Sequence, residues 1–315
     1  MSIKIPLVSV ICLCYNQARF VEEALQSVLK QTYPNIELIV ADDASQDGSK
    51  EVIENFLKNH TNVLFFSNGY NQGNCKTFNE MFAHANGKYI IDLAADDILL
   101  NNRIEAQVNA FEALNESFGV IYTDCLHISE DKKTLGKQYA TSYKPPSGDV
   151  YAAVLANYFI AAPTMMIRKT VLDTLQGYDE NLSYEDFDFW VRSARKWQYF
   201  YLDEVLTLKR KVKNSLSAQG YTLHTQQIHD STFNVCQKAF SLNKNETENK
   251  ALALRIKREM RQCLLTENFD TIIRYADLLK KLEIPGFFTK LIIGLAQRKL
   301  RLGNMYQLYR EIRRF

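Results

Sequence analysis

The sequence predicts an α/β protein built on a mostly parallel, doubly wound sheet, followed by a smaller helical part. Short apolar runs alternate with segments of helical periodicity four times before residue 97, which is the spacing of βαβ units. These runs are continuously apolar, as in strands that are buried on both faces. After about residue 220 the glycines and strand patterns give way to helical patterns, so we expect domains at 1–220 and 221–315.

The first third of the chain supplies four predicted strands, at residues 7–13, 36–41, 63–66 and 89–93. Helical periodicity between them predicts helices over residues 20–29, 52–57 and 78–85. Asn16 is placed to cap the first helix, and Asp47 or Ser49 to cap the second. Right-handed crossovers then give parallel strands with helices on both faces of the sheet.

The following segment continues the alternation less regularly. The predicted elements are a helix at 101–114, strands at 120–123 and 161–167, helices at 169–175 and 185–195, and edge strands at 199–202 and 205–208. Residues 132–149 contain two glycines and two prolines, which predicts a long surface loop. Loops of this length are frequently functional.

Composition excludes several classes of protein. A hydrophobic content of 46% argues against disorder, and a net charge of +2 gives no global sign of a nucleic-acid partner. No apolar run approaches the roughly 20 residues that span a bilayer, and the N-terminus lacks a secretory signal pattern. The six cysteines show no metal-ligand spacing and are expected to be buried thiols in a reducing compartment. We therefore expect a cytoplasmic location.

Two adjacent carboxylates, Asp96 and Asp97, follow the predicted strand at 89–93. Ligands of open α/β sheets bind outside the carboxyl ends of the strands. Adjacent carboxylates repel each other, and a divalent cation makes such a pair favourable. A second interpretation is that the pair only caps the helix that begins near Asn101. The sequence alone leaves both open.

Several stretches together resemble the family 2 glycosyltransferases of the glycosyltransferase A fold, over about residues 6–217. They are PLVSVICLCYN (6–16), LIVADDASQDGS (38–49), NQGNCKTFN (71–79), GKYIIDLAADD (87–97), GYDENL (177–182), YEDFDFWVR (184–192) and YLDEVLTLKR (201–210). Each stretch is weak evidence alone, and their order and spacing make the match specific. The resemblance implies a Rossmann-like sheet and an inverting transfer of sugar from a nucleotide sugar, with UDP as the nucleotide.

The resemblance also implies a role for individual residues. Tyr15 would stack on the nucleotide base and Asp43 would accept its ring N–H. Asp96, supported by Asp97, would bind Mg²⁺ or Mn²⁺ that bridges the two phosphates. Asp186 would be the general base that takes the proton of the acceptor hydroxyl. Residues 42–43 as turn and cap acids, and Asp186 as a first-turn helix acid, remain open as alternatives.

Other candidate residues surround these. Asn71 and Lys76 lie where a helix N-terminus approaches phosphate, although a plain helix start fits equally. Glu185, Trp190 and Arg210 are candidates for acceptor binding or for support of the site. Trp190 shares an apolar helical face with its neighbours, so core packing competes with stacking on a sugar ring.

The chain departs from the family pattern at two positions. Ala94 stands where many relatives have an acid, and Val212 stands where others have a histidine. Both losses leave a metal with fewer protein ligands, so we expect weak metal binding completed by phosphate oxygens. Lys211 or Lys213 is a candidate to supply positive charge to the diphosphate instead.

Three other functions compete with this one. A receiver-type phosphate domain needs its acids after the first strand, where this chain has Cys14, Tyr15 and Asn16. A nucleotidyltransferase needs a glycine-rich basic loop there, which is absent from the sequence. A catalytically inactive nucleotide-sugar-binding protein of the same fold stays open because of Ala94 and Val212.

The C-terminal segment predicts where in the cell the protein acts. Residues 287–315 carry seven basic residues and one acid, a net charge of +6, beside apolar positions at helical spacing. The basic residues are Lys290, Arg298, Lys299, Arg301, Arg310, Arg313 and Arg314, and the acid is Glu311. This favours an anionic membrane surface. The resemblance implies a lipid-linked or growing glycan acceptor in surface polysaccharide synthesis such as O-antigen or capsule, and an enzyme with a lipid-linked acceptor would gain from being held there. The alternative is that the helix packs onto the catalytic domain.

Overall fold

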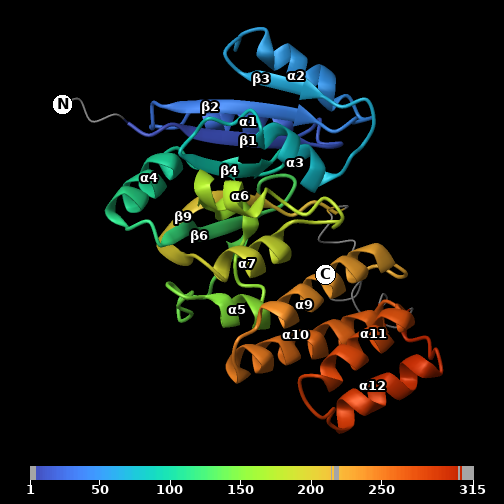
Figure 1. The fold of residues 1–315 in the computed structure, drawn as a ribbon. Coiled ribbons are helices and arrows are strands. Elements are labelled where there is room, and N and C mark those ends of the chain that lie inside the picture. Colours follow the sequence, from blue (N-terminus) through green and yellow to red (C-terminus); the bar gives the residue numbers. More distant parts are fainter. Residues whose placement is uncertain (1–4, 214, 216–219, 304–305, 307–315) are drawn as a thin grey trace. The chain divides into compact units, whose positions relative to one another are not determined.

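The computed structural model describes residues 5–213, 215, 220–303 and 306 (Figure 1). The chain forms two compact units. The first consists of residues 1–150, 159–180 and 196–212, and the second of residues 151–158, 181–195 and 213–315. The units therefore part at residue 212 rather than 220, and the second unit also takes two earlier segments.

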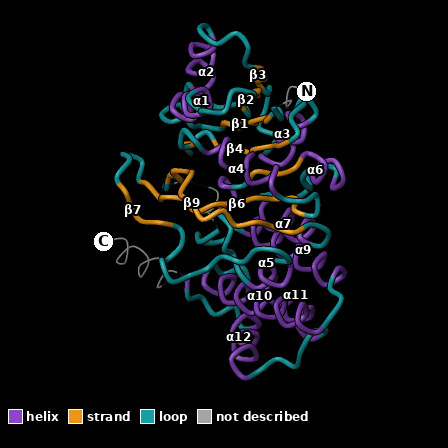
Figure 2. Tube along the Cα trace, turned by 90° about the vertical axis from the view of Figure 1, so that its left-hand side faces the viewer, coloured by secondary structure: helices purple, strands orange, loops and turns teal. Residues whose placement is uncertain are grey.

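The described strands of the first unit form a nine-stranded sheet (Figure 2). Eight follow the order β3-β2-β1-β4-β8-β6-β9-β5, and β7 pairs with β6. The strands are β1 (Val8–Cys14), β2 (Ile36–Asp42), β3 (Leu64–Ser67), β4 (Tyr89–Ala94), β5 (Ile98–Leu99), β6 (Phe118–Ile128), β7 (Thr134–Lys137), β8 (Met166–Arg168) and β9 (Gln198–Arg210). This confirms the predicted α/β fold.

The sheet is parallel over β3, β2, β1 and β4, as the apolar runs predict. The chain adds β2 and β3 on one side of β1 and then returns to place β4 on the other side. Such a reversal makes a crevice at the carboxyl ends of the strands beside it. The ends of β1, β2 and β4 therefore lie at one edge of the sheet.

The other half of the sheet is mixed and differs from the prediction. The strand expected at 161–167 is a 3-10 turn, η1 (Ala162–Thr164), followed by the three-residue β8. Pro163 explains the change, because proline has no N–H for a strand ladder and suits the first turn of a helix. The two edge strands expected at 199–202 and 205–208 are one strand, β9, whose pairing with β6 absorbs register shifts. Part of the expected loop at 132–149 is strand β7.

The helices of the first unit are α1 (Val21–Leu29), α2 (Ser49–Leu57), α3 (Asn74–Phe82), α4 (Arg103–Ala113) and α6 (Lys169–Leu175). The described helices of the second unit are α5 (Tyr151–Ala156), α7 (Asp186–Ala194), α9 (Gln226–Leu242), α10 (Glu246–Leu265), α11 (Phe269–Lys280) and α12 (Phe287–Gln297). In the described part of the chain, every helix is too short or too polar to cross a membrane.

Asn16 does not cap α1, whose N-cap is Phe20. Its amide oxygen instead accepts a hydrogen bond from Gln46 N at 2.8 Å. Asp47 does serve the start of α2, since its carboxylate accepts from Ser49 N at 3.1 Å. The six cysteines are buried free thiols, as predicted.

Gly87, which precedes β4, shows how closely the strands approach. Its N–H donates to Ser9 Oγ at 2.8 Å and to Glu37 Oε1 at 3.0 Å. A Cβ atom at this position would lie 2.5 Å from the Ser9 backbone nitrogen. Backbone atoms inside a sheet have little freedom to move away, so only glycine fits here.

Gly87→Ala is therefore expected to lower the free energy of unfolding by about 1–3 kcal/mol, the usual cost of overpacking. Urea denaturation measures the loss. Gly69→Ala is the matched control, because a Cβ there meets no atom within 4 Å. Equal midpoints for the two variants would contradict this interpretation of the packing.

Candidate active site at the strand ends

The loops that follow β1 and β2 are joined by short hydrogen bonds. Asn16 N donates to Ser45 Oγ at 2.9 Å, and Ala18 N donates to Asp47 Oδ2 at 3.0 Å. These bonds fix the backbone after Tyr15, and Asp43 N donates to the carbonyl oxygen of Cys14, before it, at 2.8 Å. The Tyr15 side chain is 47% exposed, and an exposed aromatic ring held at the strand ends is suited to stack on a planar ligand.

Asp43, directly after β2, anchors the next loop. Its buried carboxylate accepts from Asn68 Nδ2 at 2.8 Å, Gln72 N at 2.9 Å and Gly73 N at 2.9 Å. A carboxylate offers about four acceptor positions, so three are used within the protein. The turn-and-cap interpretation is thus correct in part, although the helix that Asp43 serves is α3 rather than α2. One acceptor position remains for a ligand N–H.

Asn71 and Lys76 flank the start of α3. Asn71 is exposed and Lys76 is half-buried in the first turn of the helix. Neither side chain has a hydrogen-bond or ion-pair partner among the described residues. Gly73, with φ of 88°, turns the chain between them. The positions remain suited to an anion, as the sequence predicts.

Asp96 and Asp97 stand in the turn after β4, where Asp97 N donates to Ala94 O at 3.0 Å. Asp97 is 4% exposed, and its Oδ1 accepts from Arg210 N at 2.8 Å. The half-buried Asp96 carboxylate receives no hydrogen bond from any other described residue. Burial, and then the charge of Asp96, raise the pKa of Asp97 to about 7, and burial also raises the pKa of Asp96. A cation placed here would relieve this unfavourable pair of charges.

The helix-capping alternative for this pair is wrong. Strand β5 lies between the acids and α4, and the N-cap of α4 is Asn102. The fit to a divalent cation is limited in ligand number: within the described ranges, no cluster of three or more His, Cys, Asp or Glu side chains is present. Asp96 and Asp97 fit a cation whose remaining ligands come from phosphate or water.

Arg210, at the end of β9, supports this turn and is not an acceptor contact. Its guanidinium group is buried and donates to Asp96 O at 3.0 Å and to Glu23 Oε2 at 2.8 Å. Further bonds reach the carbonyl oxygens of Ser129 at 3.2 Å and Glu130 at 3.0 Å. With its donors engaged, the side chain fixes the acids relative to the turn between β6 and β7.

Two cations near the acids were missed by sequence reasoning. Arg103 is fully buried, and its guanidinium donates to Thr207 Oγ1 and Met165 O, both at 3.0 Å. Burial lowers the pKa of Arg103 to about 9, although the charge of Asp97 acts in the opposite direction. Lys209 precedes Arg210 on β9 and lowers the pKa of both aspartates. No sequence signal identifies either, because each meets the acids through tertiary pairing.

The predicted base, Asp186, lies in the second unit at the first position of α7, and Glu185 is the N-cap. Asp186 is half-buried, and its carboxylate meets no donor among the described residues. Asp188, two positions later, is 1% exposed and pairs with Arg192 and Lys238, both at 2.6 Å. Of these two aspartates, only Asp186 has a carboxylate available to a ligand. The first-turn position also satisfies the helix-dipole interpretation.

Trp190 is a core residue and not a sugar platform. Its side chain is 2% exposed and meets Tyr158 edge to face at 6.1 Å between ring centroids. A ring without an open face does not stack on a sugar. Trp190 therefore supports α7 from within the second unit.

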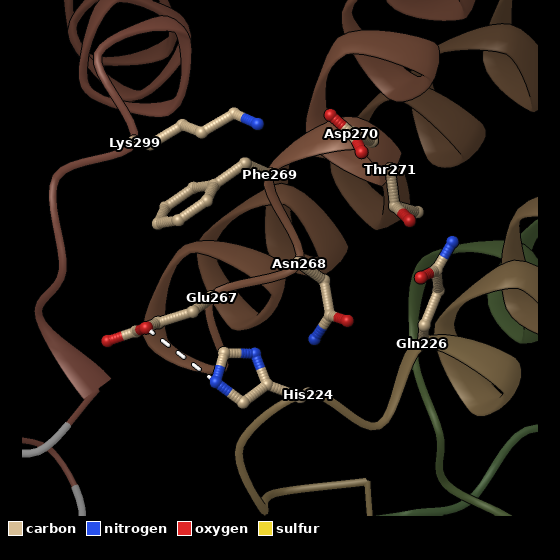
Figure 3. Close-up of a pocket in the computed structure, with 8 residues that line it drawn as sticks. All are labelled: His224, Gln226, Glu267, Asn268, Phe269, Asp270, Thr271 and Lys299. Carbon is tan, nitrogen blue, oxygen red and sulfur yellow. Dashed lines mark ion pairs between the residues drawn. The ribbon is translucent and has the colours of Figure 1, made fainter.

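A pocket of about 190 Å³ in the second unit is separate from these residues (Figure 3). In it His224 Nε2 faces Glu267 Oε2 at 4.0 Å. Its lining residues are His224, Gln226, Glu267, Asn268, Phe269, Asp270, Thr271 and Lys299. None of them is a predicted site residue.

Comparison with known proteins gives consistent matches. The family described as Glycosyl transferase family 2 matches residues 9–175. An uncharacterized glycosyltransferase of Methanocaldococcus jannaschii is 29% identical over 212 residues, which are 66% of this chain and 72% of that protein. A putative teichuronic acid biosynthesis glycosyltransferase of Bacillus subtilis is 27% identical over 217 residues, covering 69% of this chain and 83% of that one.

A solved structure is similar in fold. TarS residues 1–349 of S. aureus, in complex with UDP-GlcNAc, superposes with a TM-score of 0.68 at 17% identity. The match covers 93% of this chain and 88% of that one. The two proteins therefore share a fold.

The role of Asp43 in holding the loop before α3 is open to a stability test. Asp43→Ala removes three accepted hydrogen bonds and leaves the half-buried N–H groups of Gln72 and Gly73 without this acceptor, so a loss of about 1–3 kcal/mol is expected. Urea unfolding monitored by circular dichroism gives the value. Glu51→Ala, an exposed acid in the first turn of α2, should stay within about 0.5 kcal/mol of wild type. An Asp43 variant as stable as the Glu51 variant would mean that the loop does not depend on Asp43.

Proposed function

The chain belongs to glycosyl transferase family 2, and from that premise we propose that it transfers a sugar from a nucleoside diphosphate to an acceptor hydroxyl, with inversion at the anomeric carbon. The observation that carries the proposal is the half-buried Asp96 carboxylate, which receives no hydrogen bond from any other described residue, beside Asp97 at the end of β4. A ligand that brings positive charge would stabilise such a pair.

For the donor we propose a UDP-sugar. The exposed ring of Tyr15 takes the base, and the remaining acceptor position of Asp43 takes the ring N–H. Asn71 and Lys76 approach the phosphates from the start of α3. The fold shared with a protein bound to UDP-GlcNAc supports the nucleotide class. The transferred sugar is left open.

For the metal we propose that Asp96 and Asp97 hold Mg²⁺ or Mn²⁺. When bound, the ion would supply positive charge to the departing diphosphate. Ala94 is exposed and contributes no ligand, so these two carboxylates are the protein's share of the coordination. Asp97 is kept in place by the Arg210 N–H, which leaves its second oxygen for the ion.

For the base we propose Asp186. A carboxylate that accepts no hydrogen bond from described residues is free to take the acceptor's proton as the hydroxyl oxygen attacks the anomeric carbon. The carbonyl oxygen of Glu185, the N-cap of α7, accepts from Phe189 N at 2.9 Å, and the buried Trp190 anchors the same helix in the core.

Asp186→Asn is expected to keep the fold and donor binding while turnover falls by at least about a hundredfold, as general-base loss predicts. Release of UDP from UDP-sugars gives the rate, and a melting curve checks the fold. Glu246→Gln removes an acid from the first turn of α10 and controls for the effect of the helix dipole. Normal turnover by the Asp186 variant would place the base elsewhere, and no UDP release by wild type across a panel of donors would favour an inactive binding protein.

For the place of action we propose the inner face of the membrane, with a lipid-linked or growing glycan of a surface polysaccharide as acceptor. The name of the B. subtilis relative supports the polysaccharide class. We propose that residues 132–149, of which 134–137 form β7, and the segment after them read the sugar and the acceptor.

Helix α12 and the turn before it support membrane attachment. Ile284 is 89% exposed, Phe287 76%, Phe288 78% and Leu291 49%. The described basic residues on and after the helix are Lys290, Arg298, Lys299 and Arg301, while Arg310, Glu311, Arg313 and Arg314 lie outside the described residues. The alternative of a fully packed helix is wrong for the two phenylalanines and Leu291. We call Ile284, Phe287, Phe288 and Leu291 the apolar tip.

An apolar tip beside basic residues fits an anionic bilayer. Phe287→Ser with Phe288→Ser is expected to weaken binding to phosphatidylglycerol vesicles at least about tenfold, because each ring contributes on the order of 1.5 kcal/mol when buried. Vesicle flotation measures binding. Leu254→Ser, at a 55% exposed position of α10, is the matched control.

Wild-type protein that does not float with anionic vesicles at low salt would exclude membrane attachment. In that case, dimers in wild type and monomers in the double variant would assign the apolar tip to contact between copies of the chain.

A further inference from the structure

Lys209 lies opposite Asp97 through the pairing of β5 with β9. The two strands are antiparallel, with Ile98 beside Leu208 and Leu99 beside Thr207. Continuing that register by one residue sets Asp97 against Lys209. The bond from Arg210 N to Asp97 Oδ1 at 2.8 Å fixes the backbone on the far side of the lysine. The position of Lys209 relative to the acids is therefore set by backbone contacts.

The side chain of Lys209 is half-buried and has no hydrogen-bond or ion-pair partner among the described residues. Its position opposite Asp97 in the register places it beside the acids, in keeping with its lowering of the pKa of both. The distance to each carboxylate exceeds 4.0 Å, because neither forms an ion pair with it. A lysine and an aspartate that are neighbours but form no ion pair can bind a metal–diphosphate ligand together, the aspartate at the cation and the lysine at the anion.

The other lysines named from the sequence are placed differently. Lys211 follows the end of β9 and is exposed. Lys213 belongs to the second unit and is also exposed. Neither shares the fixed register that holds Lys209 against Asp97.

We propose that Lys209 Nζ binds the diphosphate of the nucleotide sugar, next to the acids, as a cation that is part of the protein. The inference rests on the proposed function. In the transfer, the bond between the anomeric carbon and the β-phosphate oxygen breaks, and its electron pair stays on that oxygen. The acceptor oxygen bonds to the anomeric carbon and gives its proton to Asp186. The ammonium group stabilises the charge that grows on the diphosphate.

This assignment gives a physical reason for the loss of metal ligands at Ala94 and Val212. A metal with two protein carboxylates binds weakly, and a fixed ammonium group supplies part of the same positive charge without a metal. Two components of diphosphate affinity follow: one that depends on Lys209 and persists in EDTA, and one that depends on Asp96 and needs the metal.

Calorimetric titration of UDP into the full chain separates these components. Lys209→Met is expected to weaken UDP binding in EDTA about tenfold or more, the usual size for a bond to a charged group, and Lys209→Arg to restore most of it. Asp96→Ala should bind as wild type does in EDTA and lose the gain that Mn²⁺ gives. Lys30→Met, at an exposed position after α1, is the control, and melting curves confirm that each variant is folded.

Two results overturn the inference while leaving the proposed function intact. The first is equal affinity of wild type and Lys209→Met for UDP in EDTA, which includes the case in which wild type binds UDP only with Mn²⁺. The second is a loss of UDP affinity in Lys211→Met and not in Lys209→Met. If wild type binds UDP in neither condition and releases none from UDP-sugars, the proposed UDP donor itself is wrong.

Discussion

The hydrogen bond from Arg210 N to Asp97 Oδ1 is the contact on which the candidate site depends. It joins the end of β9 to the turn after β4, more than a hundred residues apart in the chain. The arginine side chain extends the same junction to α1 through Glu23 and to the turn after β6 through backbone carbonyls. Because a buried guanidinium without partners is costly, these segments are held together as a set. The aspartates thus stand on a fixed frame rather than on a free loop.

That frame keeps two acids in an environment that disfavours their charge. Burial raises the pKa of both, and each is next to the other. The buried Arg103 and the half-buried Lys209 offset part of this penalty, yet neither forms an ion pair with the acids. Positive charge brought near Asp96 by a ligand would relieve the remaining penalty, and the proposed donor and metal site rests on this expectation.

The sequence predicts the parallel half of the sheet well because its strands are buried on both faces, and a continuous apolar run is a strong local signal. The prediction of secondary structure fails where strand pairing in the folded protein, or a single residue, determines the local conformation. Pro163 turns an expected strand into a 3-10 turn, and bulges allow β9 to continue through the exposed Asp203 and Glu204. In the candidate site, the aspartates could be predicted from the sequence because their residue type and position after a strand already indicate a charged site. Lys209 is missed because its importance arises from the register of β5 against β9, which no local pattern contains.

In helix α7 the structure shows which acids already have charged partners, a distinction that residue type alone does not give. The stretch YEDFDFW presents three acids within four residues, and any of them has the chemistry of a base. Asp188 is buried between Arg192 and Lys238, so its charge is already balanced, and protonating it would break two short ion pairs. Glu185 is the N-cap and has further contacts of its own. Asp186 is half-buried and receives no hydrogen bond from the described residues. A general base must hold no competing donor, and of the three acids only Asp186 meets this condition among the described residues, which is why we propose it as the base.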